Sequence, residues 1–137
     1  MRTSSCKAKG RRLQQLVRDD LRAFGVTYGL EDDDIKSTTM GESGVDIQLS
    51  PAAKKVWGLA IECKNVEKLN VVGVFQKHYK LYEKESETKV LVHARNHTEA
   101  MVTMRWEDFL KLLVKNLGLR TLANEAISKL NEDKQKI

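Results

Sequence analysis

Gly41-Glu42-Ser43-Gly44-Val45-Asp46-Ile47-Gln48-Leu49-Ser50-Pro51 is the first half of the stretch that decides the fold. After a short basic link, the second half reads Val56-Trp57-Gly58-Leu59-Ala60-Ile61-Glu62-Cys63-Lys64-Asn65. Apolar and polar residues alternate in both halves, which is typical of β-strands that each bury one face. We therefore predict two neighbouring strands, joined as a hairpin, that bring Asp46, Glu62 and Lys64 together.

Charged residues at the end of an apolar strand need an explanation. Burying a charge is costly unless the charge is paired or binds a metal ion. Two carboxylates from adjacent strands, with an ammonium group two residues further on, make a small site for a divalent cation. Such a site is suited to the hydrolysis of a phosphodiester bond. A plain alternative is an exposed strand end that carries a Glu–Lys pair of little energetic weight.

The pattern Gly44-Val45-Asp46 followed by Glu62-Cys63-Lys64 resembles the PD-(D/E)XK nuclease superfamily, with Val45 in place of the family's proline. Lys9-Gly10 before an amphipathic helix is similar to the opening of the archaeal-type Holliday junction resolvases in that superfamily. The resemblance covers about residues 9 to 104, and it also suggests the short phage-encoded endonucleases. It implies an α/β fold: a restriction-endonuclease-like core with a central mixed β-sheet flanked by helices.

The resemblance also implies roles for individual residues. Asp46, Glu62 and the backbone carbonyl of Cys63 would bind Mg²⁺, with Mn²⁺ as a substitute, because hard cations prefer oxygen ligands. Lys64 would orient or deprotonate the attacking water, or stabilise developing charge. Gln76, in the helix after the Glu-x-Lys strand, would support this site as a further catalytic residue.

One position departs from the resolvase pattern. In that group a glutamate of the first helix joins the metal site, whereas the matching position here is Gln14, which brings no charge. The departure predicts either a one-metal site or a second cation served by another acid, for which Glu42 is the candidate.

Composition favours a nucleic-acid partner. The chain has 137 residues and a net charge of +5, and the first eighteen residues contain basic side chains but no acidic one. A positively charged segment of this kind attracts phosphates. The residues that we expect to contact DNA are Lys9, Arg11, Arg12, Ser43, Lys54 and Lys55, the last two at the tip of the hairpin.

Two further features bear on location and cofactors. The sequence has no apolar run long enough to span a bilayer, so we expect no membrane partner. With only two cysteines, a disulfide is not expected, and a reducing compartment is the natural setting. We therefore expect a cytoplasmic protein, in the host cytoplasm if phage-encoded, that uses no small-molecule cofactor.

The remaining sequence predicts one nuclease domain over residues 1–137. Residues 1–8 are expected to be a flexible basic tail, and Gly118 is expected to separate two helices, the second of which frays within 119–137. The buried face of the second helix is expected to include His78, as a packed residue, and Leu81. The other predicted elements are helices over 11–24 and 70–85, the second one capped by Asn70, and strands over 35–39, 88–95 and 100–104.

The function that we expect is metal-dependent hydrolysis of DNA phosphodiesters, selective for branched DNA and chiefly for the four-way Holliday junction. Because a junction is two-fold symmetric, a homodimer would present two sites to it. Two alternatives stay open. One is a nicking or restriction-like nuclease acting on linear or single-stranded DNA. The other, which Gln14 favours, is a non-catalytic DNA-binding protein with a nuclease-like fold.

Overall fold

The computed structural model describes residues 4–39 and 44–135. Where the sequence predicted a single domain, the chain divides into two compact units, Met1–Met104 and Arg105–Ile137. The first unit holds every strand of the described residues, and the second consists of the helix α4 (Trp106–Gln135). All of the described candidate site residues therefore belong to the first unit.

The first helix, α1 (Ser4–Gly25), begins earlier than the sequence predicted. Residues 4–8 form its first turns instead of the expected tail, and Lys9 and Gly10 lie inside it instead of before it. No proline or β-branched residue interrupts this segment, so the helix extends without an apolar stripe of its own. Further along, Leu13 is buried in the core, where Val17 and Leu21 pack against the buried cluster.

Two short strands follow α1 and the 3₁₀ turns at Val26–Tyr28 and Asp32–Asp34. The strands β1 (Ile35–Ser37) and β2 (Ile47–Leu49) pair antiparallel, with Ile35 opposite Leu49. Ile47 and Leu49 are buried while Gln48 is exposed, which confirms the alternation predicted after Asp46.

The predicted hairpin is wrong, because a helix joins the two halves of the deciding stretch. After β2 the chain forms α2 (Pro51–Val56), capped by Ser50, whose Oγ accepts a hydrogen bond of 3.1 Å from the Ala53 N–H. Ser and Pro at these positions are typical of a helix start. Lys54 and Lys55 consequently lie on a helix and not at a hairpin tip, and Lys54 Nζ is 3.2 Å from Glu87 Oε1.

Replacing the cap of α2 is expected to weaken the fold locally. Ser50→Ala removes the acceptor of the Ala53 N–H, and the loss of a serine cap costs about 1 kcal/mol. Urea denaturation should show this loss as a lower midpoint with an unchanged slope. Ser86→Ala, at an exposed serine in a turn, serves as the control and should leave the midpoint unchanged. Equal midpoints for both variants would show that the cap does not stabilise the fold.

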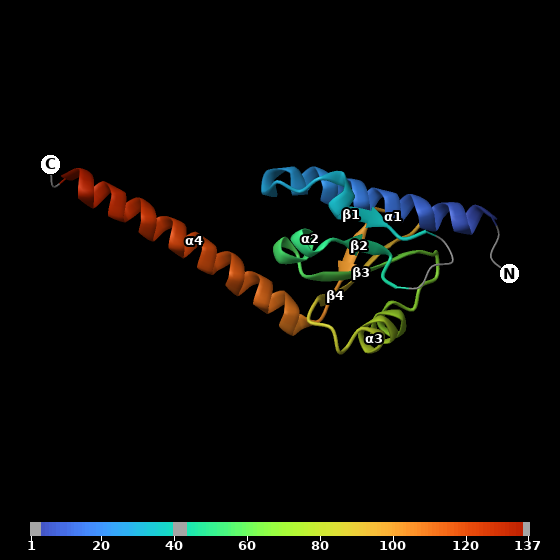
Figure 1. Cartoon of the computed structure of the whole chain (residues 1–137). Coiled ribbons are helices and arrows are strands. Elements are labelled where there is room, and N and C mark those ends of the chain that lie inside the picture. The colour runs from blue at the N-terminus through green and yellow to red at the C-terminus, as the bar shows by residue number, and fades with distance from the viewer. Residues whose placement is uncertain (1–3, 40–43, 136–137) are drawn as a thin grey trace. The chain divides into compact units, whose positions relative to one another are not determined.

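The strand that carries Glu62 and Lys64 is β3 (Leu59–Asn65). It runs parallel to β4 (Thr88–Ala94), which pairs antiparallel with β5 (Met101–Thr103), giving the order β3-β4-β5. This mixed sheet confirms the α/β class. Helix α1 packs against one face of it, and α3 (Val71–Leu81) packs against the other (Figure 1).

Helix α3 begins where the sequence predicted. The Oδ1 atom of Asn70 accepts a hydrogen bond of 3.1 Å from the Gly73 N–H, and this confirms the predicted cap. Phe75 and His78 are buried, but Leu81 is 71% exposed and does not belong to the buried face. The helix ends at Leu81, before the predicted end at residue 85, and Tyr82 packs edge-on against His78.

In the second unit, Gly118 does not end a helix. Helix α4 continues through it to Gln135, as one element in place of the two predicted. A glycine inside a helix costs only about 1 kcal/mol relative to alanine, which strong helix formers on both sides can offset. Among the described residues, no helix has both the length and the apolar character needed to cross a membrane.

Candidate active site

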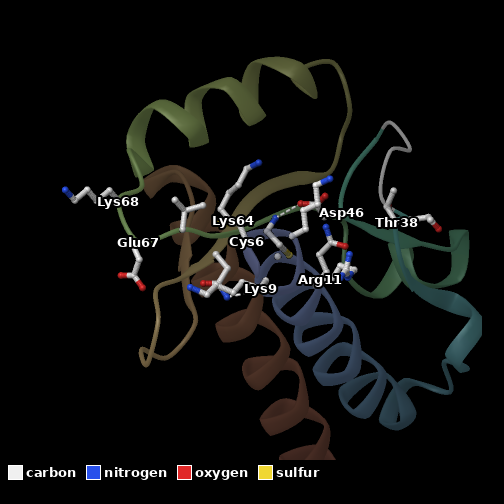
Figure 2. A pocket seen from close by; sticks show the side chains of 15 residues that line it. Cys6, Lys9, Arg11, Thr38, Asp46, Lys64, Glu67 and Lys68 are labelled. Atoms are coloured by element: carbon white, nitrogen blue, oxygen red, sulfur yellow. Dashed lines mark hydrogen bonds between the residues drawn. The ribbon is translucent and has the colours of Figure 1, made fainter. Parts of the chain in front are cut away.

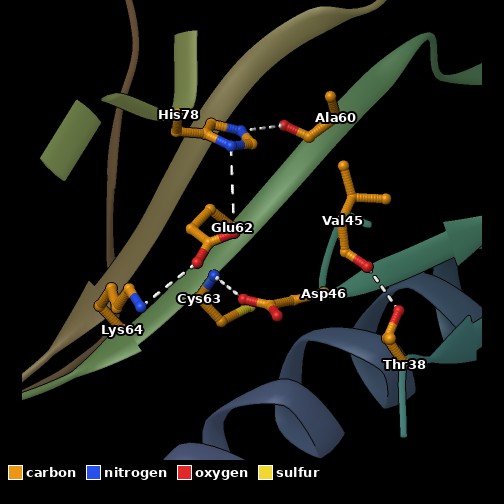
Figure 3. A network of polar contacts seen from close by, with 8 residues as sticks. All are labelled: Thr38, Val45, Asp46, Ala60, Glu62, Cys63, Lys64 and His78. Atoms are coloured by element: carbon orange, nitrogen blue, oxygen red, sulfur yellow. Dashed lines mark hydrogen bonds and ion pairs between the residues drawn. The ribbon is translucent and has the colours of Figure 1, made fainter. Parts of the chain in front are cut away.

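Asp46 is attached to the edge of β3 by two hydrogen bonds, one from its backbone and one to its side chain. The Asp46 N–H donates to the Ile61 carbonyl over 3.0 Å, and the Cys63 N–H donates to Asp46 Oδ2 over 2.7 Å (Figure 3). These two β3 residues flank Glu62, so the bonds place Asp46 directly beside Glu62. The structure thus brings the two predicted carboxylates together, although β2 itself pairs with β1.

A threonine fixes the approach of the chain to Asp46. Thr38, which is buried, donates its backbone N–H to the Asp46 carbonyl over 2.8 Å, and its hydroxyl donates to the Val45 carbonyl. The segments on either side of residues 40–43 are therefore clamped together next to the site. Nothing in the sequence pattern indicated this role for Thr38.

The side chain of Glu62 extends from β3 towards α3, where it has two basic neighbours. Lys64 Nζ is 3.4 Å from Glu62 Oε1, and His78 Nδ1 is 3.9 Å from Glu62 Oε2 (Figure 3). The other ring nitrogen of His78, Nε2, lies 2.9 Å from the Ala60 carbonyl, which can only accept, so Nε2 carries a hydrogen. His78 is packed, as the sequence predicted, but its contact with Glu62 depends on helix packing that the sequence could not reveal.

The surroundings of Glu62 disfavour its negative charge. Burial is the main cause that raises the pKa of Glu62, and the neighbouring Asp46 carboxylate raises it further. The positive charge of Lys64, and that of His78 when its ring is protonated, act in the opposite direction without cancelling the effect. Two carboxylates held close together in a partly buried place form a site that an additional cation would stabilise.

This raised pKa gives a testable dependence of stability on pH. Folded Glu62 holds its proton more tightly than unfolded Glu62, so its contribution to stability is largest at low pH and is lost as pH rises through its folded pKa. Glu62→Gln, which mimics the protonated form, should therefore raise the melting temperature at pH 7 in EDTA, and this gain should shrink towards pH 4. Glu83→Gln, at an exposed glutamate, should show neither effect. A lower melting temperature for Glu62→Gln at pH 7 would contradict this assignment.

A pocket of about 600 Å³ opens on the α1 side of Asp46 (Figure 2). It is lined by residues of α1, of the chain after β1, and of the end of β3 and the loop beyond it. Asp46 and Lys64 belong to the lining, whereas Glu62 does not. The pocket and the carboxylate pair are therefore neighbours that share Asp46, and the basic lining residues are Lys7, Lys9, Arg11, Lys64 and Lys68.

The other predicted site residues fall in different places. Lys9, Arg11 and Gln14 line the pocket, and Gln14 thus lies on the same lining as Asp46. Arg12 is exposed on α1 outside the lining, and Gln76 is exposed on α3, also outside it. Glu42 and Ser43 lie outside the described residues. Lys7 and Lys68 line the pocket although the sequence gave no specific reason to select them among the lysines.

The donor atoms at the site suit a hard cation. Asp46 and Glu62 are the candidate ligands, and within residues 4–39 and 44–135 no group of three or more His, Cys, Asp or Glu side chains is arranged to hold a metal ion. Mg²⁺ is commonly held by one or two carboxylates and keeps several waters. The Cys63 carbonyl points to the same strand edge as the Cys63 N–H, towards Asp46, since both groups of a residue in an extended strand point the same way. Burial raises the pKa of the Cys63 thiol, which disfavours the thiolate form that a metal ion would need.

We compared the chain with protein-family models, with curated proteins and with solved structures, and none of the three comparisons found a match.

Proposed function

We propose that this protein is a divalent-metal-dependent DNA endonuclease with a restriction-endonuclease-like core. The observation that carries the proposal is the position of Asp46, which two hydrogen bonds hold beside Glu62. Glu62 in turn contacts Lys64, which follows it by two residues on β3. Asp46 and Glu62 would hold Mg²⁺ together with the Cys63 carbonyl. The basic pocket next to Asp46 supports a polyanionic substrate.

The residues of the chain divide the hydrolytic work between them. When bound, Mg²⁺ would supply Lewis-acid activation of a phosphate oxygen and a lower pKa for water. Lys64 lies beside the carboxylate pair, where its ammonium group orients the attacking water and balances charge that develops on the phosphate. The water oxygen forms a bond to phosphorus and gives up a proton to solvent, the P–O bond to the leaving strand breaks, and the leaving oxygen takes up a proton from solvent. Glu62 holds Lys64 in place through their 3.4 Å contact.

Branched DNA is the substrate that we propose. The Lys9-Gly10 pair lies inside α1 and not before it, but both residues line the pocket that shares Asp46 with the carboxylate pair. Phosphate contacts position a nucleic acid without reading its sequence, which suits recognition by structure. A homodimer would apply two such sites to a two-fold symmetric junction.

The proposal is tested by incubating a labelled four-way junction, and a linear duplex of the same arm sequence, with the protein in Mg²⁺ or EDTA. We expect paired, symmetric cuts in the junction that EDTA abolishes, and slower cutting of the duplex. Equal cutting of both substrates would retain the endonuclease and discard selectivity for branches. Tight binding without cutting of either, in Mg²⁺ or Mn²⁺, would instead indicate the non-catalytic DNA-binding protein that Gln14 favours.

A further inference from the structure

The pocket on the α1 side of Asp46 has features that the cleavage site does not require. Lysines on an open surface are enough to contact DNA phosphates away from the cleaved bond. Here, however, the basic side chains line a cavity of about 600 Å³. This volume lies within the range of roughly 300–1,000 Å³ that is typical of small-ligand sites. A compact cavity of this volume is only about 10 Å across, so it can enclose a single strand but not a duplex, whose major groove alone is about 12 Å wide.

The walls of the pocket are held in place by the core of the unit. Asn65, at the end of β3, donates its side-chain Nδ2–H to the Lys9 carbonyl of α1 over 3.3 Å. Across the cavity, Thr38 is bound to the backbone of Val45 and Asp46. The cavity is therefore bounded by elements that are hydrogen-bonded to one another.

The lining matches a sugar-phosphate chain more closely than a base. Basic side chains outnumber acidic ones, and the amide and hydroxyl groups of Gln14, Asn65 and Thr38 add neutral hydrogen-bonding partners. None of the described residues that line the pocket is aromatic, so bases have no ring on which to stack. The acidic lining residues are Asp46 and Glu67, and Glu67 accepts a hydrogen bond of 2.8 Å from the Asn96 N–H.

The position of Asp46 connects this pocket to the cleavage site. Because Asp46 belongs both to the lining and to the carboxylate pair, a strand in the pocket lies next to the phosphate that is cut. We infer that the pocket binds the sugar-phosphate backbone of a single DNA strand that has parted from its duplex partner, as strands do at the branch point of a junction, so that the enzyme cuts beside the branch point. This inference rests on the proposed function, and it adds the local structure that the substrate must have.

Gly10 provides a way to test the pocket. It lines the cavity, and a Cβ added there would meet no heavy atom within 4 Å, so the backbone position has room for a side chain to begin. Gly10→Glu adds bulk and negative charge, and Gly10→Gln adds the same bulk without charge. Ser86→Glu is the matched control, because it makes the same charge change at an exposed turn outside the lining. Lys68→Glu is a second pocket variant on a loop, in case a change within α1 disturbs folding.

Binding is measured by fluorescence anisotropy with a labelled single-stranded oligonucleotide and with a blunt duplex of the same length, both in Ca²⁺. Circular dichroism checks that each variant is folded. We expect Gly10→Glu and Lys68→Glu to weaken single-strand binding at least tenfold and duplex binding less than twofold. Ser86→Glu should change both less than twofold. Gly10→Gln should weaken single-strand binding by an intermediate factor.

Two results would overturn the inference: single-strand affinity within twofold of wild type in folded Gly10→Glu and Lys68→Glu, or equal losses for the single strand and the duplex. The same variants separate this failure from failure of the endonuclease proposal. If the pocket variants still cut DNA with metal and bind the single strand as wild type does, the inference about the pocket is wrong and the endonuclease proposal stands. If wild type cuts no DNA but the pocket variants selectively lose single-strand binding, the endonuclease proposal is wrong and the inference that the pocket binds a strand stands.

Discussion

Asp46→Asn is expected to reduce DNA cleavage by at least about 10³-fold while the protein stays folded. The loss follows because a metal ligand contributes several kcal/mol to transition-state stabilisation, and each 1.4 kcal/mol or so is a factor of ten in rate. Folding should survive because the amide oxygen of asparagine can still accept the hydrogen bond from the Cys63 N–H. The change therefore removes the charge and keeps the contact.

The expectation is checked by cleavage rates in saturating Mg²⁺ together with thermal unfolding with and without the metal. A ligand at 100 times its Kd stabilises the folded state by about 2.7 kcal/mol, so wild type should melt higher in Mg²⁺ and Asp46→Asn should not. Asp33→Asn, at an exposed acid outside the site, should behave like wild type in both assays. Undiminished cleavage by Asp46→Asn would remove Asp46 from the active site.

Lys64→Met is expected to lower the cleavage rate by about 10²–10⁴-fold, the range for loss of a positioned acid–base group. Methionine retains a long apolar stem but has no ammonium group to orient water or balance charge. Lys64→Arg should restore little, because a guanidinium group cannot be deprotonated and differs in shape. Since Lys64 is not a metal ligand here, the Mg²⁺-induced rise in melting temperature should persist in Lys64→Met.

This pattern distinguishes the two residues. Asp46→Asn should lose both cleavage and stabilisation by the metal, whereas Lys64→Met should lose cleavage alone. The assays are the same, with Lys84→Met as the control at an exposed lysine outside the pocket lining. Lys64→Met with a cleavage rate within threefold of wild type would show that Lys64 has no part in the chemistry.

The sequence predicted the strands and their chemical content because these depend on local patterns. The charged end of β3 singled out Glu62 and Lys64, but burial along β3 does not alternate as predicted, because Ala60 is buried as well as Ile61 and Cys63. Asn70 has a side chain that suits a helix start, and the structure confirms it as the cap of α3. Asp46 was placed beside Glu62 correctly, but through a wrong hairpin.

The errors have physical causes. Ser50-Pro51 is compatible both with a helix start and with a strand end followed by a turn. The sequence was interpreted as the turn, whereas the structure has the helix α2 there. Gly118 suggested a helix end, but its cost is small enough for α4 to continue. The contact of His78 with Glu62 and the clamp made by Thr38 arise from packing between segments distant in the chain, which no local pattern encodes.

Occupation of one divalent cation site by Asp46 and Glu62 is the foundation of the proposed activity. Its most direct test is anomalous diffraction from crystals of the protein soaked in Mn²⁺. The predicted result is an anomalous peak within coordination distance of both carboxylates, and its loss in Asp46→Asn crystals. Anomalous peaks elsewhere on the protein, with none between Asp46 and Glu62, would contradict the proposed metal site and with it the mechanism.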